Sequence, residues 1–202
     1  MDGGLGAVGA LAHHRGMAAA PPDPTDETLM LRYAAGEAAA FAPLYARHKD
    51  GVWRYLLRGS HNEASTAELF QDVWASVVKS RASYQPTARF ATWLYRLAHN
   101  RLVDHWRSTK PNDELDEEAQ QLAGSEHETP AARAVQSEQS MRLLAALEAL
   151  APEQREAFLL QAEGGLSLED IAATQGVGRE TVKSRLRYAL VKLRKELADV
   201  WP

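Results

Sequence analysis

The stretch GGLSLEDIAATQGVGRETVKSRLRYALVKLRKEL, residues 164–197, decides the fold of the C-terminal part of the chain. Ser167, followed three residues later by Asp170, is a capping pattern for a short helix over 168–174. Gly176 then supplies a turn, because a positive φ is favourable mainly for glycine. In the helix that follows, apolar residues recur at helical spacing at Val182, Leu186, Ala189 or Leu190, Leu193 and Leu197. This order of elements predicts a helix-turn-helix, whose second helix is shaped for the major groove of DNA.

The polar side chains of that second helix have suitable chemistry for DNA. Arginine and lysine neutralise phosphates or bond guanine edges, glutamate can accept from cytosine, and serine and threonine bond either phosphate or base. A basic amphipathic helix can also be an ordinary solvated surface. The capped helix and the glycine turn before it favour DNA binding. The predicted DNA-binding residues of this helix are Arg179, Glu180, Thr181, Lys183, Ser184 and Arg187.

Charge is distributed unevenly along the chain, which has a formal net charge of -4 over 202 residues. Residues 178–195 contain seven basic residues and one acidic residue, whereas residues 108–140 contain eight acidic and two basic ones. The acidic stretch has few large apolar residues and cannot bury enough surface to offset its ordering entropy. We therefore expect a disordered tail over 1–25, a domain over 26–107, a flexible acidic linker over 108–135 and a second domain over 136–202.

Apolar residues in both expected domains recur at helical spacing rather than in alternation. The sequence therefore predicts an all-α protein of two small helical domains joined by the linker. In the first expected domain, Ser65 and Glu68 form a capping pattern before a stripe of apolar residues. Pro43 near the start of one helix and Pro152 near the start of another fit the first turn, where a missing N–H costs little.

Several classes of function are excluded or disfavoured by composition. The chain has no cysteine, which excludes disulfides, thiolate zinc sites and thiol nucleophiles within it. No apolar run approaches the roughly 20 residues of a spanning helix, so we expect no membrane insertion. The histidines are scattered without metal-ligand spacing or an obvious carboxylate partner, and no phosphate-binding glycine loop is present. We expect no enzyme activity, no catalytic residue, no metal and no cofactor.

Four segments of the chain resemble parts of one protein family. LAPEQREAFLLQAEGGLSLEDIAATQGVGRETVKSRLRYALVKLRKEL, residues 150–197, is similar to region four of the extracytoplasmic-function (ECF) sigma factors, which belong to the sigma-70 family. Three segments resemble region two of the same family: ETLMLRYAAGEAAAFAPLYARH, AELFQDVW and FATWLYRLAHNRLVDHWR. The resemblance implies a cytoplasmic specificity subunit that binds bacterial core RNA polymerase and directs promoter recognition, melting and transcription initiation.

The resemblance also implies roles for residues of region two. Glu68, Gln71 and Asp72 would contact the core polymerase. The melted promoter strand would be held by Tyr84 and Asn100, with Arg96, Arg101 and Arg107 along its backbone. The sequence departs from the family before the polymerase-binding helix, where GSHNEASTAE keeps only two acidic residues of the usual acidic run. Among the aromatics, Phe90 and Trp93 are expected in the core, whereas Tyr95 and Trp106 could lie in the core or contact nucleic acid.

Two other functions remain open at this point. The first is a stand-alone helix-turn-helix regulator that binds duplex DNA without polymerase, and the second is an interaction module without a DNA function. The acidic linker could thread through a positively charged polymerase channel or act as a plain tether. Within the sigma-factor interpretation, promoter DNA and an anti-sigma factor held between the two domains are the expected partners besides the polymerase.

Overall fold

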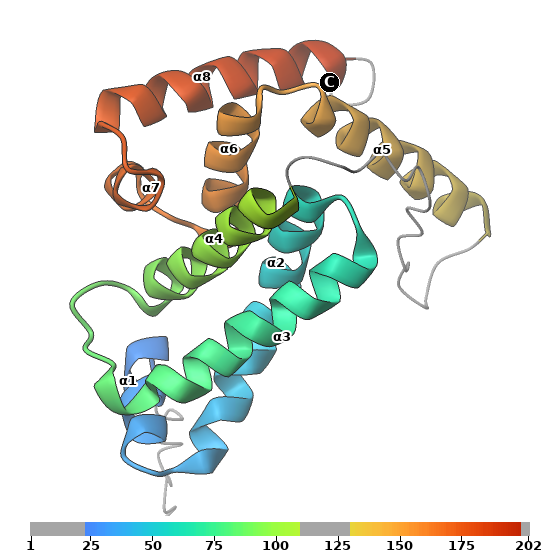
Figure 1. The fold of residues 1–202 in the computed structure, drawn as a ribbon. Helices are drawn as coiled ribbons and strands as arrows, with labels where there is room; N and C mark the ends of the chain where they lie inside the picture. Colours follow the sequence, from blue (N-terminus) through green and yellow to red (C-terminus); the bar gives the residue numbers. More distant parts are fainter. Residues whose placement is uncertain (1–22, 110–129, 199–202) are drawn as a thin grey trace, which may run out of the picture.

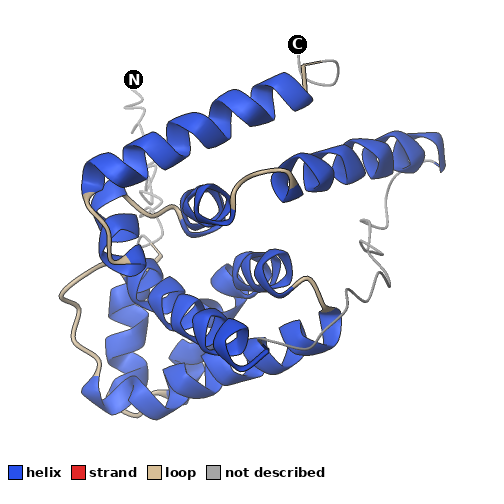
Figure 2. Ribbon diagram, turned by 45° about the horizontal axis from the view of Figure 1, so that its top comes forward, coloured by secondary structure: helices blue, strands red, loops and turns tan. Residues whose placement is uncertain are grey.

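The computed structural model describes residues 23–109 and 130–198, and within these ranges the chain forms helices and no strands (Figures 1 and 2). The all-α expectation is confirmed. Most of the expected tail, residues 1–22, and most of the expected acidic linker, including its acids from Asp113 to Glu128, lie outside the described residues.

The N-terminal domain consists of four α-helices and two short 3-10 turns. These are α1 (Asp26–Ala34), η1 (Ala38–Ala40), α2 (Phe41–Ser60), α3 (Glu63–Ser80), η2 (Arg81–Ser83) and α4 (Phe90–Thr109). Helices α2, α3 and α4 pack against one another, and α1 lies at one end of the bundle (Figure 1). A carboxylate of α1 stabilises the start of α4, since the Phe90 N–H donates to Glu27 Oε1 at 2.7 Å. The same bond lowers the pKa of Glu27.

The C-terminal domain consists of α5 (Pro130–Glu148), α6 (Pro152–Gly164), α7 (Leu168–Gln175) and α8 (Arg179–Glu196). Helix α8 packs on α6 and α7, and it also contacts α5. Pro152 stands at the start of α6, as expected, and α6 ends at Gly165, which adopts a left-handed φ of 59°. Helix α5 begins at Pro130, six residues before the start expected for this domain.

The core of the protein runs through both domains. One buried cluster joins residues of the N-terminal domain, such as Leu94 and Leu102, with residues of α6, α7 and α8, such as Leu160, Ile171 and Val182. A second, smaller cluster joins α5 to the end of α8. Helix α6 lies against both α2 and α4, so it is the element of the C-terminal domain that contacts the N-terminal domain most extensively (Figure 1).

One predicted helix start is wrong. The capping pattern of Ser65 and Glu68 predicts a start near Ser65, but α3 begins two residues earlier, at Glu63. Asn62 is the N-cap, and its Oδ1 accepts a hydrogen bond of 2.9 Å from the Ser65 N–H. Asparagine is at least as good an N-cap as serine, so the earlier residue prevails.

Candidate nucleic-acid interface

The predicted helix-turn-helix is present as α7, a glycine turn and α8. Ser167 Oγ accepts from the Asp170 N–H at 3.1 Å, and the Ser167 N–H donates back to Asp170 Oδ2 at 3.3 Å. This reciprocal pair is the predicted capping box. Gly176 ends α7 with a φ of 66°, a conformation that costs a side-chain-bearing residue about 1 kcal/mol or more. Local sequence signals therefore fix the angle at which α8 leaves the turn.

Helix α8 has one buried side and one exposed side. Val182, Leu186, Ala189 and Leu193 are buried against the rest of the domain, as expected, whereas Leu190 is partly exposed. The predicted DNA-binding residues lie mostly on the exposed side: Arg179, Glu180, Thr181, Lys183 and Arg187 are exposed, and Ser184 is half-buried. The structure therefore brings this set together on one accessible surface, which we call the α8 face.

Ion pairs organise the N-terminal end of the α8 face. The Arg179 guanidinium donates from Nε to Glu169 Oε1 at 2.5 Å and from Nη1 to Glu180 Oε1 at 3.3 Å. The bond to Glu169 raises the pKa of Arg179 and lowers that of Glu169. Lys183 Nζ lies 3.7 Å from Glu180 Oε2. Further along, the Arg187 guanidinium lies 5.1 Å from the centre of the Tyr188 ring. Acidic side chains therefore balance the positive charge of Arg179 and Lys183 at the start of α8. No acidic partner is described for Arg187, which lies beside an aromatic ring.

Three of the four residues predicted on α4 for the melted strand share one side of the helix. Arg96, Asn100 and Arg107 are exposed and recur at helical spacing, opposite the buried side that contains Leu94 and Ala98. Arg107 Nη1 lies 3.8 Å from Asp104 Oδ1 in an exposed ion pair. We call this surface the α4 face.

Arg101 does not belong to the α4 face. Its Nη2 donates to Ser76 Oγ of α3 at 3.1 Å, so the guanidinium is directed toward the neighbouring helix. Its position, one residue after Asn100, turns it about 100° around the helix. The contact of Arg101 with the backbone of the melted strand stays a prediction. Such a contact would come from a different side of α4 than the α4 face.

Tyr84, which is predicted to hold a melted base, is buried in the N-terminal domain. Only 8% of the residue is exposed, and its ring packs edge-on against Phe90 and Trp93 with centroid distances of 6.2 and 5.1 Å. Its hydroxyl has no hydrogen-bond partner among the described residues. Burial, followed by the charges of Glu27 and Asp26, raises the pKa of the phenol to about 12. In this arrangement the ring cannot stack on a base without leaving the core.

The residues predicted to contact polymerase lie on the exposed side of α3. Glu68, Gln71 and Asp72 are all exposed, opposite the buried stripe that contains Leu69 and Val73. They occur at positions i, i+3 and i+4 and therefore form one polar patch. We call this patch the α3 face. Its function stays a prediction.

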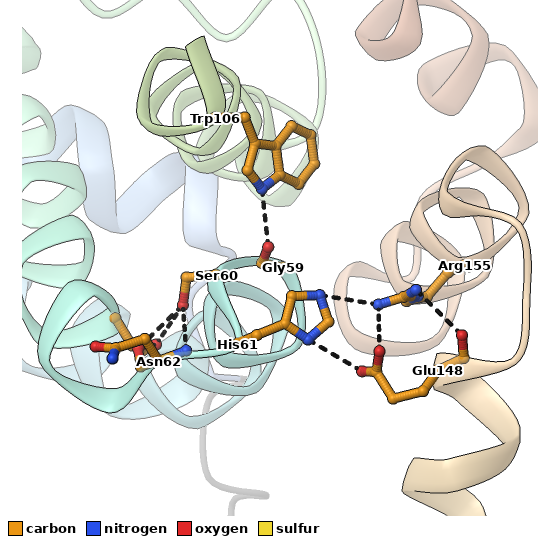
Figure 3. A network of polar contacts seen from close by, with 8 residues as sticks. Gly59, Ser60, His61, Asn62, Trp106, Glu148 and Arg155 are labelled. Atoms are coloured by element: carbon orange, nitrogen blue, oxygen red, sulfur yellow. Dashed lines mark hydrogen bonds and ion pairs between the residues drawn. The ribbon is translucent and has the colours of Figure 1, made fainter. Parts of the chain in front are cut away.

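The four aromatics of α4 have distinct positions. Phe90 is fully buried and Trp93 packs beside it, as expected. Of the two left open, Tyr95 is buried and donates from its hydroxyl to the Glu163 carbonyl at 2.8 Å. Trp106 is 36% exposed and donates from Nε1 to the Gly59 carbonyl at 2.9 Å (Figure 3). Tyr95 therefore belongs to the contact between the domains.

Sequence analysis found no obvious carboxylate partner for the histidines, but the structure gives one to each of three histidines. His48 lies 2.6 Å from Asp26, His99 lies 2.5 Å from Glu156, and His61 lies 3.2 Å from Glu148. These partners are 22 to 87 residues away in sequence, so no local pattern indicates them. Among the described residues no group of three or more such side chains could hold a metal ion.

Comparisons with known proteins identify the class of protein that this fold and these faces define. The family model described as Sigma-70 region 2 matches residues 44–111, and that described as Sigma-70, region 4 matches residues 140–193. The chain is 34% identical over 174 residues to the RNA polymerase sigma factor CarQ of Myxococcus xanthus, covering 85% of this chain and 97% of the relative. The chain therefore belongs to the sigma-70 family.

Further comparisons narrow the family. The ECF RNA polymerase sigma factor RpoE of Cereibacter sphaeroides is 30% identical over 162 residues, which cover 79% of this chain and 87% of the relative. Among solved structures, the sigma factor RpoE of Bartonella quintana has a similar fold, with a TM-score of 0.63 and 21% identity over 80% of this chain and 98% of that one. Within the sigma-70 family, the chain is an ECF sigma factor. No described helix is long and apolar enough to cross a membrane.

Proposed function

We propose that this alternative sigma factor recognises the upstream promoter element as duplex through the α8 face and captures the melted downstream strand along the α4 face. The observation that carries the proposal is the exposed, basic α8 face on a correctly capped helix-turn-helix. Side chains near the N-terminus of a recognition helix are those that contact base edges. Arg179, Lys183 and Arg187 are therefore proposed to contact bases or phosphates of the upstream element.

The proposed role of the α4 face is to hold single-stranded DNA while core polymerase begins transcription. Arg96 and Arg107 would neutralise phosphates, and Asn100 would bond the edge of an unstacked base. Tyr84 is proposed to join this site only after the segment before α4 rearranges, because its ring is buried in the free protein. The α3 face is proposed to bind the core polymerase through charged and amide side chains.

An anti-sigma factor is proposed as a further partner. The similarly folded sigma factor RpoE of Bartonella quintana was solved in complex with the anti-sigma factor NepR. Because core polymerase and promoter DNA are its proposed partners, the protein is also proposed to act in the cytoplasm. No catalytic reaction is proposed for the chain itself.

Transcription in vitro tests the proposal. Purified protein, core polymerase and genomic DNA should give transcripts with defined start sites, and the variant Lys183→Glu with Arg187→Glu should give few of them. Absence of promoter-dependent transcripts with an active core preparation would refute the proposal. Tight specific binding to duplex DNA without polymerase would instead favour the stand-alone regulator.

A further inference from the structure

A loop of residues 84–89 joins η2 to α4, and we call it the 84–89 loop. Tyr84 at its start is buried, whereas residues 85–89 are all exposed. The loop leads directly into α4, the helix that carries the α4 face. Its position therefore decides which of its side chains can lie beside a strand that is bound to that face.

Glu27 of α1 holds the end of the loop next to α4. Its Oε1 accepts from the Phe90 N–H at 2.7 Å, and the two residues are 63 positions apart in sequence. Phe90 is the first residue of α4, so its N–H has no acceptor within the helix. A carboxylate at the N-terminus of a helix is also favoured by the helix dipole. Glu27 therefore caps α4 from another helix and fixes the start of α4 relative to α1.

Tyr33, on the same helix as Glu27, contacts the segment at the other end of the loop. The Arg81 guanidinium of η2 lies 5.6 Å from the centre of the Tyr33 ring, within the range of a cation–π contact. Helix α1 packs against both η2 and α4 (Figure 1). The segments on both sides of the 84–89 loop therefore contact one helix.

Helix α1 is itself attached to α2 and to the core. Asp26 Oδ1 accepts from Arg47 Nη1 at 2.7 Å, and Asp26 Oδ2 lies 2.6 Å from His48 Nε2. Burial by itself would raise the pKa of Asp26, but the hydrogen bonds with Arg47 and His48 lower it below its ordinary value. Leu29 and Met30 of α1 are buried. The attachment of α1 to the domain therefore does not require the loop.

The Tyr84 side chain is held in a different way from the ends of the loop. Its ring packs against Phe90 and Trp93, and its buried hydroxyl has no hydrogen-bond partner in the part of the chain that the structure describes. The ring can therefore leave its site without breaking a hydrogen bond of its own. The contacts of Glu27 and Tyr33 do not involve this ring, so they can persist when it moves.

We propose that α1 positions the 84–89 loop for strand capture: Glu27 and Tyr33 keep the two ends of the loop in place while Tyr84 leaves the core to contact the melted strand. This role rests on the proposed function, in which the α4 face captures that strand. A loop whose ends are already fixed loses less conformational freedom when it binds. Glu27 and Tyr33 are positioning residues, because they act on DNA only through the loop.

The bond between Glu27 and Phe90 determines how often the loop is in position. A helix without its N-cap frays at the first turn, and the end of the loop moves with it. The apparent affinity of a site falls with the fraction of molecules in which the site is formed. Loss of the cap should therefore weaken strand capture. Duplex binding by the α8 face should not change, because α8 belongs to the other domain.

Amide hydrogen exchange tests the cap in the free protein. The Phe90 N–H should exchange about fivefold faster, or more, in Glu27→Ala than in the wild type. Glu27→Gln keeps an oxygen that can accept and should retain most of the protection. Glu27→Asp keeps the charge but is one methylene shorter, so it should lose the protection. Equal exchange in the wild type and Glu27→Ala would overturn the proposal.

Binding of the holoenzyme to a single-stranded oligonucleotide measures strand capture without the melting step. The oligonucleotide carries the non-template strand of a promoter mapped by transcription, and core polymerase is saturating. Glu27→Ala and Glu27→Asp should raise the Kd about three- to tenfold, whereas Glu27→Gln should stay within about twofold of the wild type. The Kd for an upstream duplex fragment should be the same in all of them. An equal loss of duplex binding would contradict a role at the loop.

Asn62→Ala is the matched control for stability. It removes the N-cap of α3 in the same domain, so it should cost a similar amount of stability. Asn62 lies at the opposite end of this 18-residue helix from η2, about 27 Å away along its axis. Strand binding should therefore stay at the wild-type level. Equal losses in Asn62→Ala and Glu27→Ala would show that Glu27 acts only through stability, and the positioning role would fail.

Asn100→Ala separates failure of the positioning role from failure of the proposed function. Asn100 is proposed to contact the strand directly, so this variant should also weaken strand binding. Weaker binding by Asn100→Ala together with wild-type binding by Glu27→Ala would overturn the positioning role and leave the proposed function standing. Wild-type binding by Asn100→Ala would count against the α4 face itself, and the positioning role would fail with it.

The contact at the other end of the loop is tested in the same assay. Tyr33→Leu keeps an apolar side chain beside Phe41, which packs on the Tyr33 ring, but removes the ring face from Arg81. The Kd for the single strand should rise about two- to fivefold. Wild-type strand binding by Tyr33→Leu would overturn the role of this end.

Discussion

The α8 face and the α4 face differ in how complete they are in the free protein. On α8, five of the six predicted residues are exposed and the sixth is half-buried, on a helix whose start is fixed by a capping box and a glycine turn. On the N-terminal domain, Tyr84 is in the core and Arg101 is bonded to α3, so only Arg96, Asn100 and Arg107 share an exposed side.

This difference agrees with the form of DNA that each face is proposed to bind: duplex DNA for the α8 face and a melted strand for the α4 face. Duplex DNA exists before the factor arrives, so a preformed rigid surface can bind it without reorganisation. A melted strand exists only after the duplex has opened, and a site for it can be completed at that stage. The following predictions separate the two cases, beginning with the largest expected effect.

Removal of the Tyr84 ring should have the largest effect of these substitutions, and the quantity affected is the stability of the fold. Tyr84→Ala leaves a cavity beside Phe90 and Trp93, and we expect a loss of about 3–5 kcal/mol in the free energy of unfolding. Tyr84→Phe removes only a buried hydroxyl without a partner and should change stability little or raise it. Urea denaturation measures both variants. Equal stability of Tyr84→Ala and wild type would show that the ring is not part of the core, and the comparison of the faces would fail.

Truncation on the α8 face should weaken recognition of the upstream element. We expect Arg187→Ala to cost about 1–3 kcal/mol in holoenzyme binding to an upstream duplex fragment, with no change in thermal stability. Glu196→Gln, also exposed on α8, is the control. Unchanged affinity after both Arg187→Ala and Lys183→Ala would show that another surface binds the duplex.

The α4 face should affect promoter melting and not duplex binding. Asn100→Ala should lower the amount of open complex by a factor corresponding to about 1–2 kcal/mol, within the range for a contact to an unstacked base. Arg101→Ala should have a smaller effect, because its guanidinium contacts Ser76 on another side of the helix. Permanganate footprinting measures melting in both. A larger loss with Arg101→Ala would contradict the assignment of the α4 face.

The smallest effect is expected on the α3 face. Asp72→Ala removes one exposed charge and should weaken binding to core polymerase by about 0.5–1 kcal/mol. The difference should shrink as salt rises from 50 mM to 500 mM, because the Debye screening length is about 10 Å at 0.1 M and becomes shorter as ionic strength rises. A loss that is independent of salt would indicate a buried contact in place of a solvated one.

Features that depend on neighbouring residues could be predicted from the sequence. The capping box at Ser167, the turn at Gly176 and the buried side of α8 each follow from patterns within a few residues, and the structure confirms them. The predicted start of α3 was wrong because Asn62 and Ser65 can both cap a helix. The sequence alone does not show which of the two has the backbone geometry of an N-cap.

Features that depend on tertiary packing could not be predicted. The carboxylate partner of His99 is 57 residues away, and the hydroxyl of Tyr95 bonds a carbonyl 68 residues away. The burial of Tyr84 has the same origin: its position before α4 indicates a loop, but the ring enters the core formed by α4 itself. A position in a predicted loop therefore does not show whether a side chain such as that of Tyr84 is accessible to DNA.

The position of Trp106 gives the protein a built-in optical reporter. Its indole lines a cavity of about 230 Å³ between α2, α4 and α6, beside Arg155 and Leu159 of the C-terminal domain. Trp106 is 36% exposed, so a separation of the domains would expose more of the indole to water and shift its fluorescence emission to longer wavelength. The difference between the wild-type and Trp106→Phe spectra would isolate that signal from the other tryptophans, so any change at the contact between the domains could be followed in stopped flow on the unlabelled protein.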